Sequence, residues 1–152
     1  MQSMNLKEQL FNDTKQFVTL RYTVIQNQIN AIQKSLQSET KSSAGDKHET
    51  GRAMLQLERE KAGNQFIEIE RLQQILNRID ITKTSQKISL GSLVTTTNGI
   101  YFIAIGRGLV TLNNQNYYVI ALYSPIGKLL FGQQKGAVFS FNNKLIEILD
   151  IQ

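Results

Sequence analysis

The sequence has no cysteine and no tryptophan, and it has only one histidine and one proline among 152 residues. Without cysteine, the chain has no disulfide, no thiolate metal site and no cysteine nucleophile, which also removes acyl-condensing enzymes of the thiolase type. A single histidine argues against a zinc hydrolase, because zinc sites usually combine several histidine, cysteine or carboxylate ligands. The sequence therefore gives little support for an enzyme of these classes.

Long apolar runs are absent as well. No stretch approaches the roughly 20 apolar residues that a transmembrane helix needs, and residues 1–7 lack the apolar core of a signal peptide. We therefore expect a cytoplasmic protein with no membrane partner. The composition, with 41% hydrophobic and 8% aromatic residues, is normal for one ordinary soluble domain or two small ones.

The positive charge is concentrated in the C-terminal half. Residues 1–80 contain eleven Lys and Arg against ten Asp and Glu, whereas residues 81–152 contain six against two. This excess is compatible with a mildly basic solvated surface or with contact to an acidic partner. The basic residues form no dense cluster, so sequence-specific binding of nucleic acid is not expected.

Two segments with helical apolar periodicity flank a polar stretch at residues 42–51. The periodicity predicts one helix from residue 2 to about residue 38, with a break near Asp13 as an alternative, and a second from Asp46 to about residue 80. A short polar joint between two apolar seams predicts an antiparallel coiled-coil hairpin. The seam residues are Phe11, Val18, Tyr22, Ile25, Ile29, Ile32 and Leu36, then Leu55, Ala62, Phe66, Ile69, Leu72, Leu76 and Ile79.

After residue 80 the apolar period changes from that of a helix to that of a strand. Residues 81–87 are polar and aperiodic, which predicts a linker between the hairpin, residues 1–80, and a second domain, residues 88–152. That domain is expected to be a small antiparallel sheet with one short helix near Ser124, giving an α+β protein. The expected strands are 90–97, 100–105, 109–112, 117–123, 137–141 and 144–151, with Asn98-Gly99 as a hairpin turn.

Two carboxylates, Asp46 and Glu49, stand three residues apart at the expected start of the second helix. This spacing is that of a capping box, in which each side chain accepts a hydrogen bond from the backbone of the other residue. The same pair could instead share one Mg²⁺ ion. Mg²⁺ prefers about six oxygen ligands, so the pair would be a half-site that another macromolecule completes.

Other side chains at this tip also have two interpretations. His48 is either a solvated residue or a metal ligand, although no second histidine or cysteine could join it. Four cations, Lys41, Lys47, Arg52 and Arg59, surround the same region and are either solvated or in contact with RNA phosphates.

The order of motifs along the chain resembles the bacterial Gre-type transcript cleavage factors. The resemblance rests on a long helical hairpin with Gly45, Asp46 and Glu49 at its tip, followed by a small basic β-domain. That domain contains Ser124-Pro125-Ile126-Gly127, then Leu129, Leu130 and Gly132, and finally Lys135-Gly136 before a strand. The tip is less acidic than is usual in that family, with Arg52 where another acid often stands, so the chain resembles a divergent branch.

The resemblance implies a function in transcription elongation. In that family the hairpin enters the secondary channel of RNA polymerase, and the tip carboxylates help to hold a catalytic Mg²⁺ in the polymerase active centre, where backtracked RNA is cut near its 3′ end. Asp46 and Glu49 would be the metal-holding pair. The C-terminal domain would be FKBP-like, with Ser124, Pro125, Ile126 and Gly127 at or near the docking surface.

On this interpretation the protein has no catalytic activity of its own and stimulates the intrinsic RNA cleavage of the polymerase, to which it binds as a monomer. An FKBP-like fold does not by itself confer prolyl isomerase activity. Two alternatives remain: a non-catalytic regulator that occupies the secondary channel, and a coiled-coil interaction module with another partner.

Overall fold

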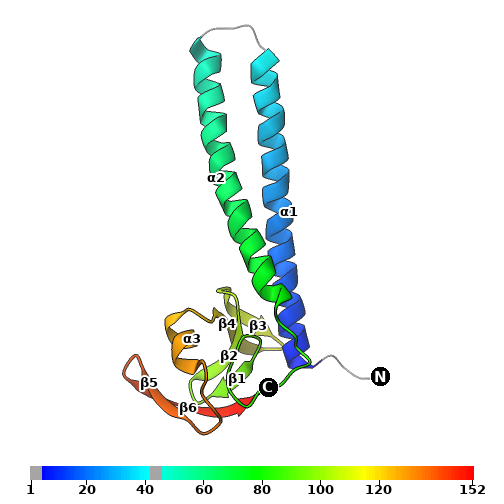
Figure 1. Ribbon diagram of the computed structural model, residues 1–152. Coiled ribbons are helices and arrows are strands. Elements are labelled where there is room, and N and C mark those ends of the chain that lie inside the picture. The colour runs from blue at the N-terminus through cyan, green and yellow to red at the C-terminus, as the bar shows by residue number, and fades with distance from the viewer. Residues whose placement is uncertain (1–4, 42–45) are drawn as a thin grey trace. The chain divides into compact units, whose positions relative to one another are not determined.

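The computed structural model describes residues 5–41 and 46–152. In order along the chain, these residues form two long helices, four strands, a short helix and two further strands (Figure 1). They divide into two compact units. One unit contains residues 16–73, and the other contains the first residues of the chain, up to Lys15, together with residues 74–152. The prediction of an α+β protein, with a helical hairpin followed by a β-domain, is confirmed.

The two long helices are α1, Leu6–Lys41, and α2, Asp46–Asn77, and they lie side by side in opposite directions (Figure 1). Within residues 16–73, the predicted seam is the buried side of the hairpin. The rings of Tyr22 and Phe66 meet across it with their centroids 5.2 Å apart. The most deeply buried apolar residues of this unit are Val18, Ile25 and Ile29 on α1 and Ala62, Ile69 and Leu72 on α2.

Helix α1 begins later than the periodicity suggested and continues without a break at Asp13. Its start is defined by Asn5, whose side-chain oxygen accepts a hydrogen bond from the backbone N–H of Glu8 at 2.8 Å. Asparagine in this position satisfies a backbone donor that the helix itself leaves unpaired. None of the helices within residues 5–41 and 46–152 combines the length and apolar composition that a membrane span requires.

The strands of the second unit form one sheet in the order β3-β4-β2-β1-β6-β5. The expectation of a purely antiparallel sheet is wrong at one pair, because β2 and β4 run parallel, with Tyr101 opposite Tyr118 and Ile103 opposite Ile120. The more buried strand β4 lies inside the sheet, and β3, which exposes Leu109, lies at its edge. The strands are β1 Leu93–Thr96, β2 Gly99–Ala104, β3 Gly108–Leu112, β4 Gln115–Ala121, β5 Val138–Phe141 and β6 Lys144–Ile151.

Two of the hairpin turns are pairs of asparagines. Asn113 and Asn114 join β3 to β4, and Asn142 and Asn143 join β5 to β6, all four with φ between 51° and 65°. Positive φ at both central residues is the geometry of a type I′ turn, which matches the twist of the flanking strands. In the β1–β2 hairpin, by contrast, Gly99 is already paired with Thr96, so the two turn residues are Thr97 and Asn98 rather than the expected Asn98 and Gly99.

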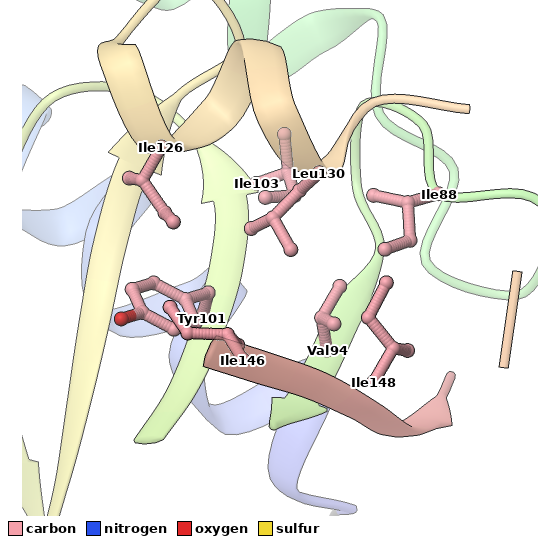
Figure 2. Close-up of a cluster of buried hydrophobic side chains, with 8 residues drawn as sticks. All are labelled: Ile88, Val94, Tyr101, Ile103, Ile126, Leu130, Ile146 and Ile148. Carbon is pink, nitrogen blue, oxygen red and sulfur yellow. The ribbon is translucent and has the colours of Figure 1, made fainter. Parts of the chain in front are cut away.

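One apolar core joins the short helix α3, Pro125–Leu130, to one face of the sheet. In Figure 2 the side chains of Ile126 and Leu130 point from α3 toward Tyr101, Val94 and the residues of β6. Leu130, Ile146 and Ile148 are fully buried. At about 25 cal/mol for each Å² of apolar surface removed from water, each such side chain contributes roughly 1.5–3 kcal/mol to stability. The core therefore holds α3 against the sheet, and with α3 the loop that precedes it.

A partly buried ion pair links the start of α1 to the loop before β3. Arg107 Nη1 lies 2.5 Å from Asp13 Oδ2, and the two side chains are 18% and 35% exposed. The same nitrogen lies 3.4 Å from the hydroxyl oxygen of the buried Thr14. Because both residues belong to the unit that contains the sheet, the pair fastens the first turns of α1 within that unit.

Replacing Arg107 with Gln is expected to lower the free energy of unfolding by about 1–2 kcal/mol, since Asp13 would lose its charged partner in a partly desolvated position. A double-mutant cycle with Asp13→Asn, followed by urea denaturation, should give a coupling energy of about 1 kcal/mol that falls at high salt. A coupling of zero at low salt would show that the pair does not stabilise the fold.

Candidate functional site

The predicted tip lies where α1 ends and α2 begins. Helix α2 begins at Asp46, as the sequence predicted, and Glu49 belongs to its first turn with an exposed side chain. The side chains of Asp46, Lys47, His48 and Lys41 lie outside the described residues, so the capping box and the two interpretations of His48 stay predictions. On a helix, residues three apart share a face, which places the 46 and 49 positions on one side of the first turn.

The electrostatic setting of this turn favours carboxylates. The first backbone N–H groups of an α-helix have no partner within the helix, and together with the helix dipole they create a positive potential at its start. Within residues 5–41 and 46–152 there is no group of three or more His, Asp or Glu side chains that could hold a metal ion.

Arg52, one of the predicted RNA contacts, bridges the two helices near the tip. Its Nη1 atom donates a hydrogen bond to the backbone carbonyl oxygen of Leu36 at 3.2 Å, and its side chain is half-buried. On the same side of the hairpin, Gly51 faces the carboxylate of Glu39, which a Cβ atom at residue 51 would meet at 3.7 Å. Arg52 on α2 is therefore tied to α1 near the tip by a hydrogen bond to a backbone carbonyl group that lies within the helix.

Arg59 has a local role as well. One of its guanidinium nitrogens lies 2.9 Å from the position that a Cβ atom would occupy at Gly63, one turn further along α2. The guanidinium group of Arg59 occupies the space that a side chain at residue 63 would need. This accounts for a glycine in the middle of a long helix.

Replacing Arg52 with Met is expected to destabilise the tip by about 1 kcal/mol, because the change removes a charged hydrogen-bond donor and keeps most of the apolar stem. Amide hydrogen exchange in the last turn of α1 should become severalfold faster. Lys34→Met, on an exposed part of α1, is the matched control and should leave the exchange rates unchanged. Equal rates in both variants would show that the Arg52 bond to Leu36 does not stabilise the hairpin.

The second predicted site, residues 124–127, forms the start of α3. The hydroxyl group of Ser124 accepts a hydrogen bond from the backbone N–H of Gly127 at 3.0 Å and donates one to the carbonyl oxygen of Ala121 at 2.7 Å. Proline follows at the first helical position, where its missing N–H costs nothing. Ile126 is buried in the core beneath the helix.

Gly127 is packed more tightly than any side chain would permit. A Cβ atom at this position would lie 2.3 Å from the carbonyl oxygen of Ala121 and 2.7 Å from that of Leu122. Three of the four predicted docking residues, Ser124, Ile126 and Gly127, thus have structural roles, and Pro125 is the exposed one.

Sequence reasoning did not identify the exposed apolar side chains that flank this motif. Tyr123 is 78% exposed and Phe131 is 55% exposed, and Leu129 on the outer side of α3 is 38% exposed. Lys128, next to Leu129 in α3, is exposed as well. We call Tyr123, Pro125, Lys128, Leu129 and Phe131 the α3 surface. Several exposed apolar side chains within one short segment are typical of a protein-binding surface.

Comparison with protein-family models and with curated proteins gave no match for this chain.

Proposed function

We propose that this protein binds RNA polymerase through its secondary channel and stimulates cleavage of backtracked RNA. The observation that carries the proposal is the helical hairpin whose second helix begins at Asp46 and exposes Glu49 in its first turn. RNA polymerase is proposed as the partner because of the resemblance to Gre-type factors, in which the hairpin and the motifs after it occur in the same order.

The dimensions of the hairpin suit insertion into a channel. From Asp46 to Gln73, the part of α2 within the hairpin unit, there are 28 helical residues, or about 42 Å at 1.5 Å per residue. The two helices pack through a buried apolar seam, and the hydrogen bond from Arg52 to Leu36 joins them near the tip. The tip therefore stands on a stiff support. A stiff support lets a side chain reach a distant reaction centre in a defined orientation.

The chemistry assigned to the tip is that of a donated half-site. Carboxylate oxygens are the ligands that Mg²⁺ prefers, and Glu49 exposes its side chain in the first turn of α2. Asp46 and Glu49 would supply oxygen ligands to a Mg²⁺ ion that the polymerase also holds, and such an ion would supply an activated water for phosphodiester hydrolysis. The chain itself supplies the two carboxylates and their positions.

The α3 surface is proposed as the docking contact of the C-terminal domain. It combines exposed apolar side chains with Lys128 around the Ser124-Pro125 motif, and aromatic side chains are enriched among the residues that dominate binding energy. Its basic residue also agrees with the net positive charge of residues 81–152.

A second candidate function is supported by the apolar surface of the hairpin. Leu20 and Val24, which are 67% and 57% exposed, line a shallow hollow of about 300 Å³ together with Ile25 and Ile69. An exposed apolar strip beside a seam can accept a further helix, as in a coiled-coil interaction module. Sedimentation equilibrium at micromolar concentration tests this function, since association that Leu20→Gln abolishes would favour it.

Phe131→Ser is expected to weaken binding to the cognate RNA polymerase at least about tenfold, because it removes an exposed aromatic contact without touching the core. The matched control is Leu145→Ser on β6. Leu145 is 77% exposed, and it alternates with Ile146, which faces the core under α3, so it points away from that core. Fluorescence anisotropy of labelled protein against polymerase measures both affinities. Equal losses in the two variants would remove the α3 surface from the proposal, and no binding by the unchanged protein would contradict the function.

A further inference from the structure

A polar hollow of about 390 Å³ lies within the unit that contains the sheet, between the start of α1, the end of α2 and the segment that leads to β1. Three cations line it: Lys7, Arg78 and Lys83. None of them was singled out by the sequence, because Lys7 is more than 70 positions away from the other two. The hollow belongs neither to the hairpin tip nor to the α3 surface.

Lys7 is the unusual member of this set, since only 6% of the residue is exposed. Its ammonium nitrogen donates a hydrogen bond to the carbonyl oxygen of Lys83 at 3.1 Å, and this is the one acceptor that the described residues provide for it. An ammonium group has three N–H donors, so this hydrogen bond leaves two more for another acceptor. Burial lowers the pKa of Lys7, while the nearby charge of Asp80 opposes that shift.

Among the described residues that line the hollow, Asp80 is the single carboxylate. Its Oδ1 atom accepts hydrogen bonds from the backbone N–H of Thr82 at 3.0 Å and from the Thr82 hydroxyl at 2.5 Å. These bonds lower the pKa of Asp80, so it is ionised at neutral pH, and they engage one of its oxygens in a local turn. Three cations against one carboxylate leave the lining positive overall.

The remaining polar side chains among the described lining residues are the hydroxyls of Thr84, Ser85, Ser89 and Ser92. The Ser85 oxygen accepts a hydrogen bond from the backbone N–H of Lys87 at 3.3 Å, and the Ser92 oxygen accepts one from that of Ser89 at 3.0 Å. Among the described residues that line the hollow there is no aromatic side chain on which a nucleobase could stack, and Leu90 is the largest apolar one. Cations suit phosphoryl oxygens, and hydroxyls suit the hydroxyl groups of a sugar. A volume of about 390 Å³ is within the usual range of small-molecule sites.

We infer that this hollow binds a small phosphorylated compound of the sugar-phosphate class, with Lys7, Arg78 and Lys83 around its phosphoryl group. Lys7 is the buried cation of the site, whereas Arg78 and Lys83 are exposed. The hydroxyl-bearing segment from Thr84 to Ser92 contacts the polyol part. Binding here does not depend on the function of the tip, so it can be measured on the isolated protein.

The experiment titrates the full chain by calorimetry with ribose 5-phosphate, ribose and inorganic pyrophosphate. We expect ribose 5-phosphate to bind, pyrophosphate to bind with similar or lower affinity, and ribose not to bind. Arg78→Gln and Lys83→Gln should each weaken ribose 5-phosphate at least about tenfold, the effect of losing one charge-assisted hydrogen bond. Lys144→Gln, an exposed lysine at the start of β6, is the matched control and should bind like the unchanged protein.

A second readout reports on the buried lysine. The side-chain ammonium resonance of Lys7 in ¹⁵N NMR spectra should shift on addition of ribose 5-phosphate, and the pKa of Lys7 should rise because an anion favours the charged form. The absence of binding by both phosphates at millimolar concentration would overturn the inference. The inference would also be overturned if Lys144→Gln weakened the binding of ribose 5-phosphate as much as Arg78→Gln and Lys83→Gln do. A third contrary result would be that neither phosphate binds, while a short single-stranded RNA binds and Arg78→Gln weakens that binding.

Discussion

Asp46→Asn and Glu49→Gln are each expected to reduce stimulated RNA cleavage at least about tenfold while polymerase binding persists. Each substitution keeps the size and hydrogen-bonding capacity of the side chain and removes the negative charge that a Mg²⁺ ligand needs. Even changes next to a metal ligand typically cost 10- to 100-fold in affinity or activity, so the loss of a ligand should cost at least as much. The measurement is the rate of RNA shortening in backtracked complexes at saturating protein.

The matched control is Glu58→Gln, which removes an exposed carboxylate from α2 beyond the first turn. It should leave both cleavage and binding unchanged. Thermal unfolding of all three variants, followed by circular dichroism, separates the loss of a metal ligand from the loss of a helix cap. A missing cap would lower helix stability by about 1 kcal/mol without abolishing the fold, whereas the loss of a ligand alone would leave stability unchanged. Undiminished cleavage in Asp46→Asn and Glu49→Gln would leave the tip with a structural role only and would favour a channel-occupying regulator.

Gly127→Ala is expected to lower the free energy of unfolding of the sheet-containing unit by about 3 kcal/mol. The new methyl group would lie 2.3 Å from one carbonyl oxygen and 2.9 Å from the hydroxyl oxygen of Ser124, where only a shift of the backbone relieves the overlap. A shift of that kind would displace α3, whose residues Ile126 and Leu130 fill the core. Urea denaturation followed by tyrosine fluorescence measures the change.

Gly106→Ala is the control for this substitution. A Cβ atom at Gly106 would meet no other heavy atom within 4 Å, and its backbone is outside the positive-φ region that favours glycine. We expect its stability to stay within about 0.5 kcal/mol of the unchanged protein. If Gly127→Ala were equally harmless but weakened polymerase binding, then residue 127 would have a direct role in docking.

The helical hairpin was predictable because its signal is local. Val18, Ile25 and Ile69 are spaced so that one helix face is apolar whatever the rest of the chain does, and all three are buried. The asparagine pairs occupy turns in which both central residues have positive φ, a conformation that asparagine tolerates better than most residues. The start of α1 was misplaced, since a single side chain, Asn5, decides it.

Features that depend on contacts between distant residues were not predictable in the same way. The parallel pairing of β2 with β4 depends on which strand occupies the interior of the sheet, and the alternating pattern of each strand does not encode its partner. The structural roles of Ser124 and Gly127 and the cross-hairpin bond of Arg52 also required the fold. At the tip, the start of α2 at Asp46 agrees with the sequence, whereas the capping box of Asp46 and Glu49 stays a prediction.

The most direct test of the central claim adds the unchanged protein and Mg²⁺ to stalled, backtracked complexes of the cognate RNA polymerase. The RNA is radiolabelled at its 5′ end and its length is followed against time. We predict that the RNA shortens faster than in complexes without the protein, and that EDTA stops the shortening. RNA of unchanged length, with binding of the protein demonstrated in the same reaction, would contradict the proposed function.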